Sequence, residues 1–193
     1  MSSDSFVFAG LELSVGRRPV IYAALNEDLE VTSLESWSIS EALGCLQNLG
    51  NAWVAVDVPA LRRPGQVYQE LKKKLPQAGF KSPAKNSPKQ WLETDAQAAF
   101  RALIGRKPLP RRTLEGRLQR ASLLYDLGLQ ITDPMDIFEE ITRYRLVQGI
   151  LPLDNLSGSS ELDALVAAYV AWLAANRPGQ VILQGELLLP VQE

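Results

Sequence analysis

Histidine is absent from this sequence, and cysteine occurs once, as Cys45. Without histidine the chain cannot build Ser-His-Asp or Cys-His nucleophilic sites, or a zinc site with histidine ligands. A single cysteine excludes an internal disulfide and a cysteine-ligated metal site, and its apolar neighbours predict a packed core thiol. Any enzymatic chemistry must therefore come from carboxylates, Lys, Arg, Ser, Thr or Tyr. The oxygen-bearing groups of this set, above all the carboxylates, suit a hard cation.

The sequence also lacks a membrane-length apolar run and a secretory signal. No stretch reaches the ~18 consecutive apolar residues of a membrane helix, and the first four residues are polar. These absences predict a cytoplasmic protein that does not bind a membrane. The chain of 193 residues, 46% hydrophobic and 22% charged, fits one globular domain with a sizeable core.

Charge is nearly balanced overall but unevenly distributed. Residues 62–120 carry 15 Lys and Arg against 4 Asp and Glu, a net charge of +11, whereas the rest of the chain carries −13. A contiguous basic segment is typical of proteins that bind polyanions, because phosphate neutralisation supplies most non-specific affinity for nucleic acid. A solvated basic surface explains the same segment equally well, so charge alone leaves both interpretations open.

Hydrophobic patterns predict a single α/β domain over residues 1–193. Apolar or alternating runs between turn residues predict three antiparallel strands, a helix capped by Ser38 or Ser40, and a further buried strand. These elements are expected at 6–13, 20–25, 29–37, 38–49 and 52–58. Their order is that of an RNase H-like fold, in which the first and fourth strands lie side by side and parallel.

The rest of the chain is predicted to be mostly helical. A basic, partly irregular insertion at 60–92 contains a helix at 66–75 and a short strand at 90–93. Capping signals then predict helices that open at Thr94, Thr113, Asp133 and Ser159 or Ser160, followed by a hairpin at 181–190. The expected sheet is mixed and five-stranded, with three antiparallel strands, then parallel additions, and helices on its flanks.

Two acids, Glu12 and Asp57, lie inside the most apolar strands. An unpaired buried carboxylate costs several kcal/mol, so each needs a partner or a metal ion. If the two strands are neighbours, both acids approach one point near the strands' carboxyl ends, where open α/β sheets bind ligands. Gly10 and Ala55 on the same faces are predicted to leave space there for an ion or substrate. Alternatively, Glu12 pairs with the arginines at 17–18, and Asp57 merely ends its strand.

Two further acids are candidates for the same cluster. Asp163 falls in the first turn of the last helix, where it also fits a capping box with Ser160. Glu93 lies just before a predicted helix cap and is otherwise an exposed loop acid. Three or four carboxylates at one end of a sheet can hold one or two Mg²⁺ or Mn²⁺ ions. One ion then activates a water, and the other stabilises the leaving oxygen of a phosphodiester.

Short motifs in a fixed order carry a resemblance that spans nearly the whole chain. The stretches are AGLELS at 9–14, VAVDVP at 54–59, WLETD at 91–95, RTLEGRLQR at 112–120, LDAL at 162–165 and LP at 189–190. In this set the chain resembles the domain-of-unknown-function family number 429, described as predicted nucleases with an RNase H-like fold. Each motif is weak alone, and the ordered set is moderately specific.

The resemblance implies a catalytic set made of Glu12, Asp57, Glu93 and Asp163. Glu12 stands where the family normally has Asp. Ser160 stands where the family has a further acid, for which Glu161 could substitute. The first, second and last of the four acids would bind metal, and Glu93 would complete or orient the site. The arginines that would contact substrate phosphates are Arg62, Arg63, Arg111, Arg112, Arg117 and Arg120.

Two hypotheses follow for function. The first is a metal-dependent nuclease or phosphodiesterase that uses Mg²⁺ or Mn²⁺ and acts on nucleic acid. The second is a binding protein on the same fold whose catalytic site has decayed. Residues 12–16 also faintly resemble the first phosphate loop of actin-like phosphotransferases, but those proteins need two such domains. The sequence leaves open whether the protein forms a homodimer.

Overall fold

The computed structural model describes residues 5–13, 19–58, 65–83, 87–138, 147–149 and 156–191. Its strands are β1 (Val7–Leu13), β2 (Val20–Leu25), β3 (Val31–Trp37), β4 (Ala52–Asp57), β5 (Lys89–Thr94), β6 (Val181–Gln184) and β7 (Leu187–Pro190). Its α-helices are α1 (Ile39–Asn48), α2 (Gln66–Lys74), α3 (Ala96–Ile104), α4 (Leu114–Asp126) and α6 (Ser159–Asn176). Short 3₁₀ turns are η1 (Pro76–Ala78), η2 (Pro134–Phe138) and η3 (Pro178–Gln180).

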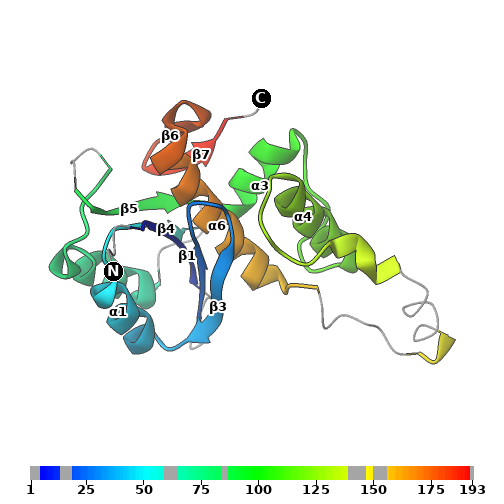
Figure 1. The fold of residues 1–193 in the computed structure, drawn as a ribbon, viewed down its shortest axis with the longest axis horizontal. Coiled ribbons are helices and arrows are strands. Elements are labelled where there is room, and N and C mark those ends of the chain that lie inside the picture. The colour runs from blue at the N-terminus through cyan, green and yellow to red at the C-terminus, as the bar shows by residue number, and fades with distance from the viewer. Residues whose placement is uncertain are drawn as a thin grey trace.

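One mixed sheet organises the molecule (Figure 1), with strand order β3-β2-β1-β4-β5-β7-β6. The first three strands form an antiparallel meander, and β1 then pairs in parallel with β4, as does β4 with β5. The α/β class, the mixed sheet and its flanking helices are therefore confirmed. The predicted neighbourhood of the first and fourth strands is confirmed as well.

The predicted count of five strands was wrong, because the sheet described here has seven. The hairpin expected near the end of the chain exists as β6 and β7, but it does not stand apart from the sheet. It adds to the open edge of β5, where Glu93 and Leu187 are register partners. The Thr94 hydroxyl also donates to the Leu188 carbonyl at 2.8 Å. An edge strand with unpaired backbone groups gains hydrogen bonds from such an addition.

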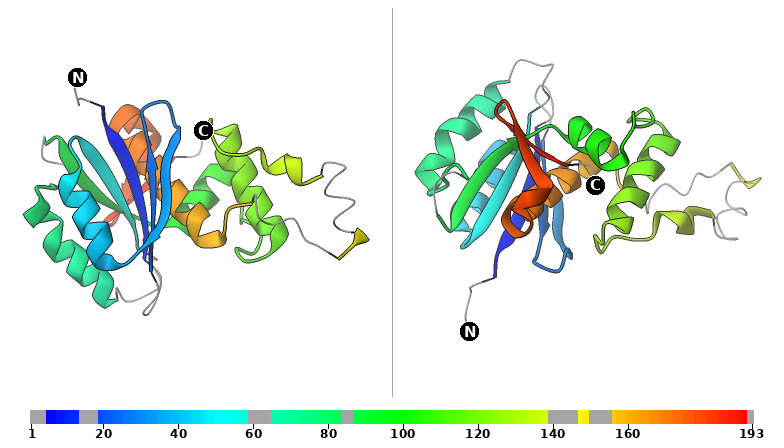
Figure 2. Two further views of the ribbon diagram at one scale, coloured as in Figure 1. Left: turned by 60° about the horizontal axis from the view of Figure 1, so that its bottom comes forward. Right: turned by 90° about the horizontal axis from the view of Figure 1, so that it is seen from above.

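Helices cover both faces of the sheet, as Figure 2 shows. On one face, α1 and α2 form a core cluster with the side chains of β1 and β4 that point to this face. The two helices contribute Leu43, Leu46, Tyr68 and Leu71 to it. Cys45 is partly buried at the edge of this cluster. On the other face, α6 is the central helix, and α3 and α4 pack beyond it in a second cluster. Because side chains alternate along a strand, neighbouring residues of β1 or β4 serve different cores.

Gly10 sets the distance between β1 and α6. A Cβ atom at this position would lie 2.0 Å from the Ala164 carbonyl oxygen and 2.4 Å from the Ala168 nitrogen. The helix backbone therefore rests directly on the strand. The expectation that Gly10 and Ala55 leave space for an ion or substrate was wrong, because helix α6 fills the space beside Gly10 and Ala55 is part of the packed core. The close approach has a different consequence, which is to bring the first turns of α6 to the level of Glu12.

Helix boundaries mostly follow the capping signals, with two differences, and one predicted helix lies partly outside the described residues. Ser38 caps α1 and Thr113 caps α4. Thr94 was expected to cap α3 but lies in β5, and Asp95 accepts the Ala98 N–H instead. Helix α6 begins after Gly158 rather than at a serine cap. The helix expected from Asp133 to residue 148 is described only in part, as η2, because 139–146 lie outside the described residues.

Candidate metal centre

Three acids that are far apart in the sequence meet at one point. Glu12 of β1 and Asp57 of β4 are register partners on adjacent parallel strands, and Asp163 reaches them from α6. One carboxylate oxygen from each lies within 4.8 Å of the others. The exposed fractions of the three residues are 6%, 6% and 2%, so the cluster is buried. The structure thus brings together the three residues that the sequence assigned to a metal.

Asp163 does not serve as a helix cap. The Glu161 carboxylate accepts the Gly158 N–H at the start of α6 and takes that role. Asp163 lies further along the helix, on the side that faces the sheet, and is nearly inaccessible to solvent. The capping-box alternative with Ser160 was therefore wrong.

Arg111 bridges two of the three acids. Its Nη2 atom lies 2.6 Å from Asp163 Oδ2 and 3.4 Å from Glu12 Oε1, and it donates to Ser160 Oγ at 3.2 Å. The alternative partners for Glu12, the arginines at 17–18, lie outside the described residues. Asp57 forms no ion pair within the described part of the chain; its Oδ1 accepts the Ala96 N–H at 2.8 Å.

Gln97, which Arg120 holds in turn, contacts the second carboxylate oxygen of Asp163. Gln97 Nε2 donates to Asp163 Oδ1 at 2.9 Å, and Arg120 Nη2 donates to Gln97 Oε1 at 3.0 Å. Arg120 is itself fixed, because its Nη1 donates to the Leu109 and Gly116 carbonyls. The sequence predicts Gln97 only as the partner of Thr94 in a capping box and not as a residue of the site.

Burial makes two of these carboxylates weak acids. It raises the pKa of Asp57 to about 8, and the charges of Asp163, Asp95 and Glu12 add to this effect against the opposing Ala96 hydrogen bond. Burial likewise raises the pKa of Asp163 to about 7, although Arg111 opposes the shift. The cluster therefore holds more negative charge, when fully ionised, than its one bridging guanidinium balances. Protons or a cation must supply the rest.

This donor set fits a hard divalent cation. Mg²⁺ and Mn²⁺ prefer oxygen ligands, and carboxylates are their usual protein ligands. Metal–oxygen bonds of about 2.0–2.6 Å place the oxygens around one ion at spacings similar to those in this cluster. The residues that would hold the ion are Glu12, Asp57 and Asp163. Bound there, a divalent ion would replace the protons that the raised pKa values imply.

Glu93 lies on the other face of the sheet, so the structure does not bring it to the three acids. It is the register partner of Val56, and its neighbour Thr94 is the partner of Asp57. The Glu93 carboxylate instead accepts from the Tyr68 hydroxyl at 2.5 Å and from Lys72 at 3.0 Å. It also lines a cavity of about 290 Å³ beside Trp91 and Leu188.

The six arginines predicted to contact phosphates have different environments. Arg62 and Arg63 lie outside the described residues. Arg111 is at the carboxylate cluster, and Arg112 beside it is exposed. Arg117 donates to the Ser157 and Leu156 carbonyls. Arg120 is only 2% exposed, which places its guanidinium within the scaffold rather than on a surface that a polyanion can reach.

The described part of the basic segment does not form one surface. Its lysines at 72–74 belong to α2, which packs on the face opposite the carboxylate cluster. The exposed Arg101, Arg106 and Arg112 belong to α3 and to the connection that leads to α4, on the same side as α6. Within the described residues, the basic side chains named here are therefore divided between two sides of the sheet.

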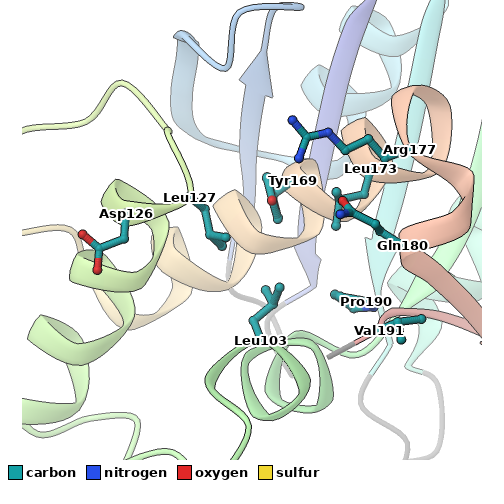
Figure 3. A pocket seen from close by; sticks show the side chains of 9 residues that line it. All are labelled: Leu103, Asp126, Leu127, Tyr169, Leu173, Arg177, Gln180, Pro190 and Val191. Carbon is teal, nitrogen blue, oxygen red and sulfur yellow. The ribbon is translucent and has the colours of Figure 1, made fainter. Parts of the chain in front are cut away.

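A separate cavity of about 280 Å³ lies between α3, α4, α6 and the end of β7 (Figure 3). Leu103, Leu127 and Leu173 give it apolar walls, and Arg177 and Tyr169 add polar groups, whereas the Asp126 carboxylate points away from the others. None of the residues that the sequence assigned to the site lines this cavity. It is distinct from the carboxylate cluster.

Comparison with known proteins gives no relatives. No family model matches the chain, and no curated protein and no solved structure is significantly similar to it. Within the described residues, none of the helices combines the length and the apolar character needed to cross a membrane.

Proposed function

We propose that the protein is a metal-dependent nuclease or phosphodiesterase of RNase H-like type. The observation that carries the proposal is the convergence of Glu12, Asp57 and Asp163, all buried, with carboxylate oxygens within 4.8 Å of one another. Burying three acids together is unfavourable without a compensating charge. Arg111 supplies one positive charge to the three acids, and a divalent cation would supply the rest.

The strand arrangement supports the RNase H-like part of the proposal. An antiparallel meander is followed by a parallel neighbour of β1, which places Glu12 beside Asp57. The motifs that resemble the domain-of-unknown-function family number 429 include both of these acids and Asp163. The proposal differs from that resemblance at Glu93, which has no place in the centre because it lies on the other face.

The chain's own residues would prepare the centre in the following way. Glu12, Asp57 and Asp163 would hold Mg²⁺ or Mn²⁺, which in such sites activates a water and stabilises the leaving oxygen of a phosphodiester. The Ala96 N–H orients Asp57, and Gln97 orients Asp163. Arg111, which contacts the cluster, and the exposed Arg112 next to it in sequence would bind phosphate oxygens of a nucleic-acid backbone.

The direct test is cleavage of a mixed panel of single- and double-stranded DNA and RNA in Mg²⁺ or Mn²⁺. Cleavage should require the divalent ion and should fall at least 100-fold in Asp57→Asn. The matched control is Asp28→Asn, which makes the same chemical change at an exposed acid of the β2–β3 turn and should retain activity. Absence of metal-dependent cleavage across the panel, or full activity in Asp57→Asn, would contradict the proposal.

A second function is a nucleic-acid-binding protein on the same fold without turnover. It is favoured by one observation, the 2.6 Å ion pair between Arg111 and Asp163, which already supplies one positive charge to the cluster. The departures from the family pattern at Glu12 and Ser160 agree with it. This protein would bind oligonucleotides in a salt-sensitive way, but no divalent ion would bring about cleavage.

A further inference from the structure

We propose that Arg111 is the resident counter-ion of the metal-free carboxylate cluster, and that a divalent cation displaces it from Glu12 and Asp163 to bind a substrate phosphate. This inference rests on the proposed function and adds a mechanism of exchange to it. Metal binding and phosphate binding would then be coupled through a single side chain.

Without metal, Arg111 contacts two of the three acids. One nitrogen, Nη2, lies at 2.6 Å from Asp163 Oδ2 and at 3.4 Å from Glu12 Oε1. These two acids are among the three that would hold the ion, so a guanidinium in this position competes with a cation for the same oxygens. Two positive groups cannot share them at contact distance without strong repulsion.

The other contacts of Arg111 allow its side chain to leave the carboxylate cluster. Its side chain is 30% exposed and donates to no backbone carbonyl in the contacts described above, although its Nε atom is buried without a hydrogen-bond partner, as is the Nε of Arg120. Ser160 Oγ, at 3.2 Å, is the neutral group that accepts from it. Arg120 is the contrast, because it is almost fully buried and donates to two backbone carbonyls. Exchange is therefore expected at Arg111 and not at Arg120.

The position of Arg111 gives it access to a substrate. It belongs to the connection between α3 and α4 rather than to either helix, and its side chain is 30% exposed while the acids are nearly inaccessible. A long side chain at this boundary can turn from the carboxylates toward solvent without moving a helix. Its planar fork then suits two phosphate oxygens.

The experiment is calorimetric titration of Mn²⁺ into the wild type, Arg111→Gln and Arg106→Gln. Arg106 lies in the same connection and is exposed, so its variant removes an equal charge without touching the cluster. Loss of the competing guanidinium should tighten Mn²⁺ binding at least tenfold in Arg111→Gln. In Arg106→Gln the affinity should change less than threefold.

A second titration measures inorganic phosphate binding to the Mn²⁺-saturated proteins. Arg111→Gln should bind phosphate at least fivefold more weakly than the wild type, although it binds Mn²⁺ more tightly. These opposite changes separate exchange from a merely structural role, which would weaken both ligands or neither. Should Arg111→Gln fail to fold, Arg111→Met removes the same charge and keeps a long side chain, and its Mn²⁺ affinity should likewise exceed that of the wild type at least tenfold.

The outcomes distinguish this inference from the proposed function. Equal Mn²⁺ affinity in the wild type and Arg111→Gln, or weaker affinity in the variant, would overturn the exchange while the metal site stands. Absence of Mn²⁺ binding in every variant would overturn the metal site and the exchange with it. Mn²⁺ binding in Arg111→Gln but not in the wild type would overturn the exchange, because the ion would then fail to displace Arg111 from the natural chain, and it would also contradict metal-dependent turnover by that chain.

Discussion

Asp57 is the residue of the site whose ionisation energetics can be measured most directly. It is buried, its hydrogen-bond donor is the Ala96 backbone, and no guanidinium pairs with it among the described residues. Burial raises the pKa of Asp57 to about 8, so the metal-free protein keeps this carboxyl protonated at neutral pH. Asn has the same shape and can accept the same hydrogen bond. The substitution therefore removes the titratable carboxyl group but keeps the shape of the side chain and its hydrogen bond.

We predict that Asp57→Asn changes how stability depends on pH. The pKa of Asp57 in the folded protein lies above the ordinary value of 3.8, so the unfolded chain loses this proton first. The wild type therefore loses stability relative to the variant as pH rises from about 4 to about 8. The difference in the free energy of unfolding should grow by up to about 1.4 kcal/mol per pH unit in this window. Urea unfolding of the metal-free proteins at several pH values measures it.

A divalent ion should reverse the order of stability of the wild type and Asp57→Asn. Mn²⁺ requires the ionised carboxylate, so it should stabilise the wild type increasingly as pH rises and should stabilise Asp57→Asn little. A difference between the two proteins that is independent of pH would contradict the burial of Asp57 as a neutral acid. The control is again Asp28→Asn, whose unfolding should follow the wild type.

At the scale of elements, the contact between β1 and α6 determines whether the site exists. Gly10 lets the α6 backbone rest on the strand, and Asp163 is thereby carried to the level of Glu12. We predict that Gly10→Ala destabilises the protein by about 3 kcal/mol or more, because its Cβ atom would meet helix backbone at 2.0 Å. It should also weaken Mn²⁺ binding, since α6 must move away from β1.

Gly44 provides the control for this substitution. It lies within α1, and a Cβ atom there would have no neighbour within 4 Å. Gly44→Ala should therefore stabilise the protein by about 0.5–1 kcal/mol through the lower helix propensity of glycine. Thermal unfolding of both variants measures the two signs. Equal effects would mean that the close approach of strand and helix is not what Gly10 provides.

Sequence patterns predicted the elements better than their contacts. The strands that hold Glu12 and Asp57 were predictable because each is a short apolar run between turn residues. The pairing of these strands followed from the order of elements. The purpose of Gly10 was not predictable, since its close contact is with a helix more than 150 residues later in the chain.

Single side chains of the site were predictable only in part. The assignment of Glu12, Asp57 and Asp163 to one place rested on charged residues in apolar segments, and the geometry agrees. Glu93 resisted prediction because one position along a strand changes the face, and the strand at 90–93 gave no alternation clear enough to fix it. Gln97 was missed because it works only through Asp163 and Arg120, which lie in other helices.

At the scale of the whole molecule, the division of basic residues has a testable consequence. The lysines of α2 lie on the face of the sheet opposite the carboxylates, whereas Arg101 and Arg112 lie on the same side as α6. We predict that Arg101→Gln/Arg112→Gln weakens binding of a 20-nucleotide single strand about tenfold. Lys73→Gln/Lys74→Gln, with the same loss of charge, should weaken it less than twofold.

Fluorescence anisotropy at several salt concentrations measures both effects. The arginine variant should also show a smaller dependence on salt, because fewer counter-ions are released on binding. Equal losses in the two double variants would indicate that net charge, rather than a surface beside the centre, governs association. A larger loss in the lysine variant would place the nucleic acid on the other face.

The most direct measurement is the anomalous diffraction of Mn²⁺ in crystals of the wild-type protein grown or soaked with the ion. We predict an anomalous peak bound by the carboxylates of Glu12, Asp57 and Asp163, at about 2.0–2.4 Å from at least one oxygen of each. A crystal in which the three acids stay together, Mn²⁺ is in excess and no peak lies between them would contradict this prediction.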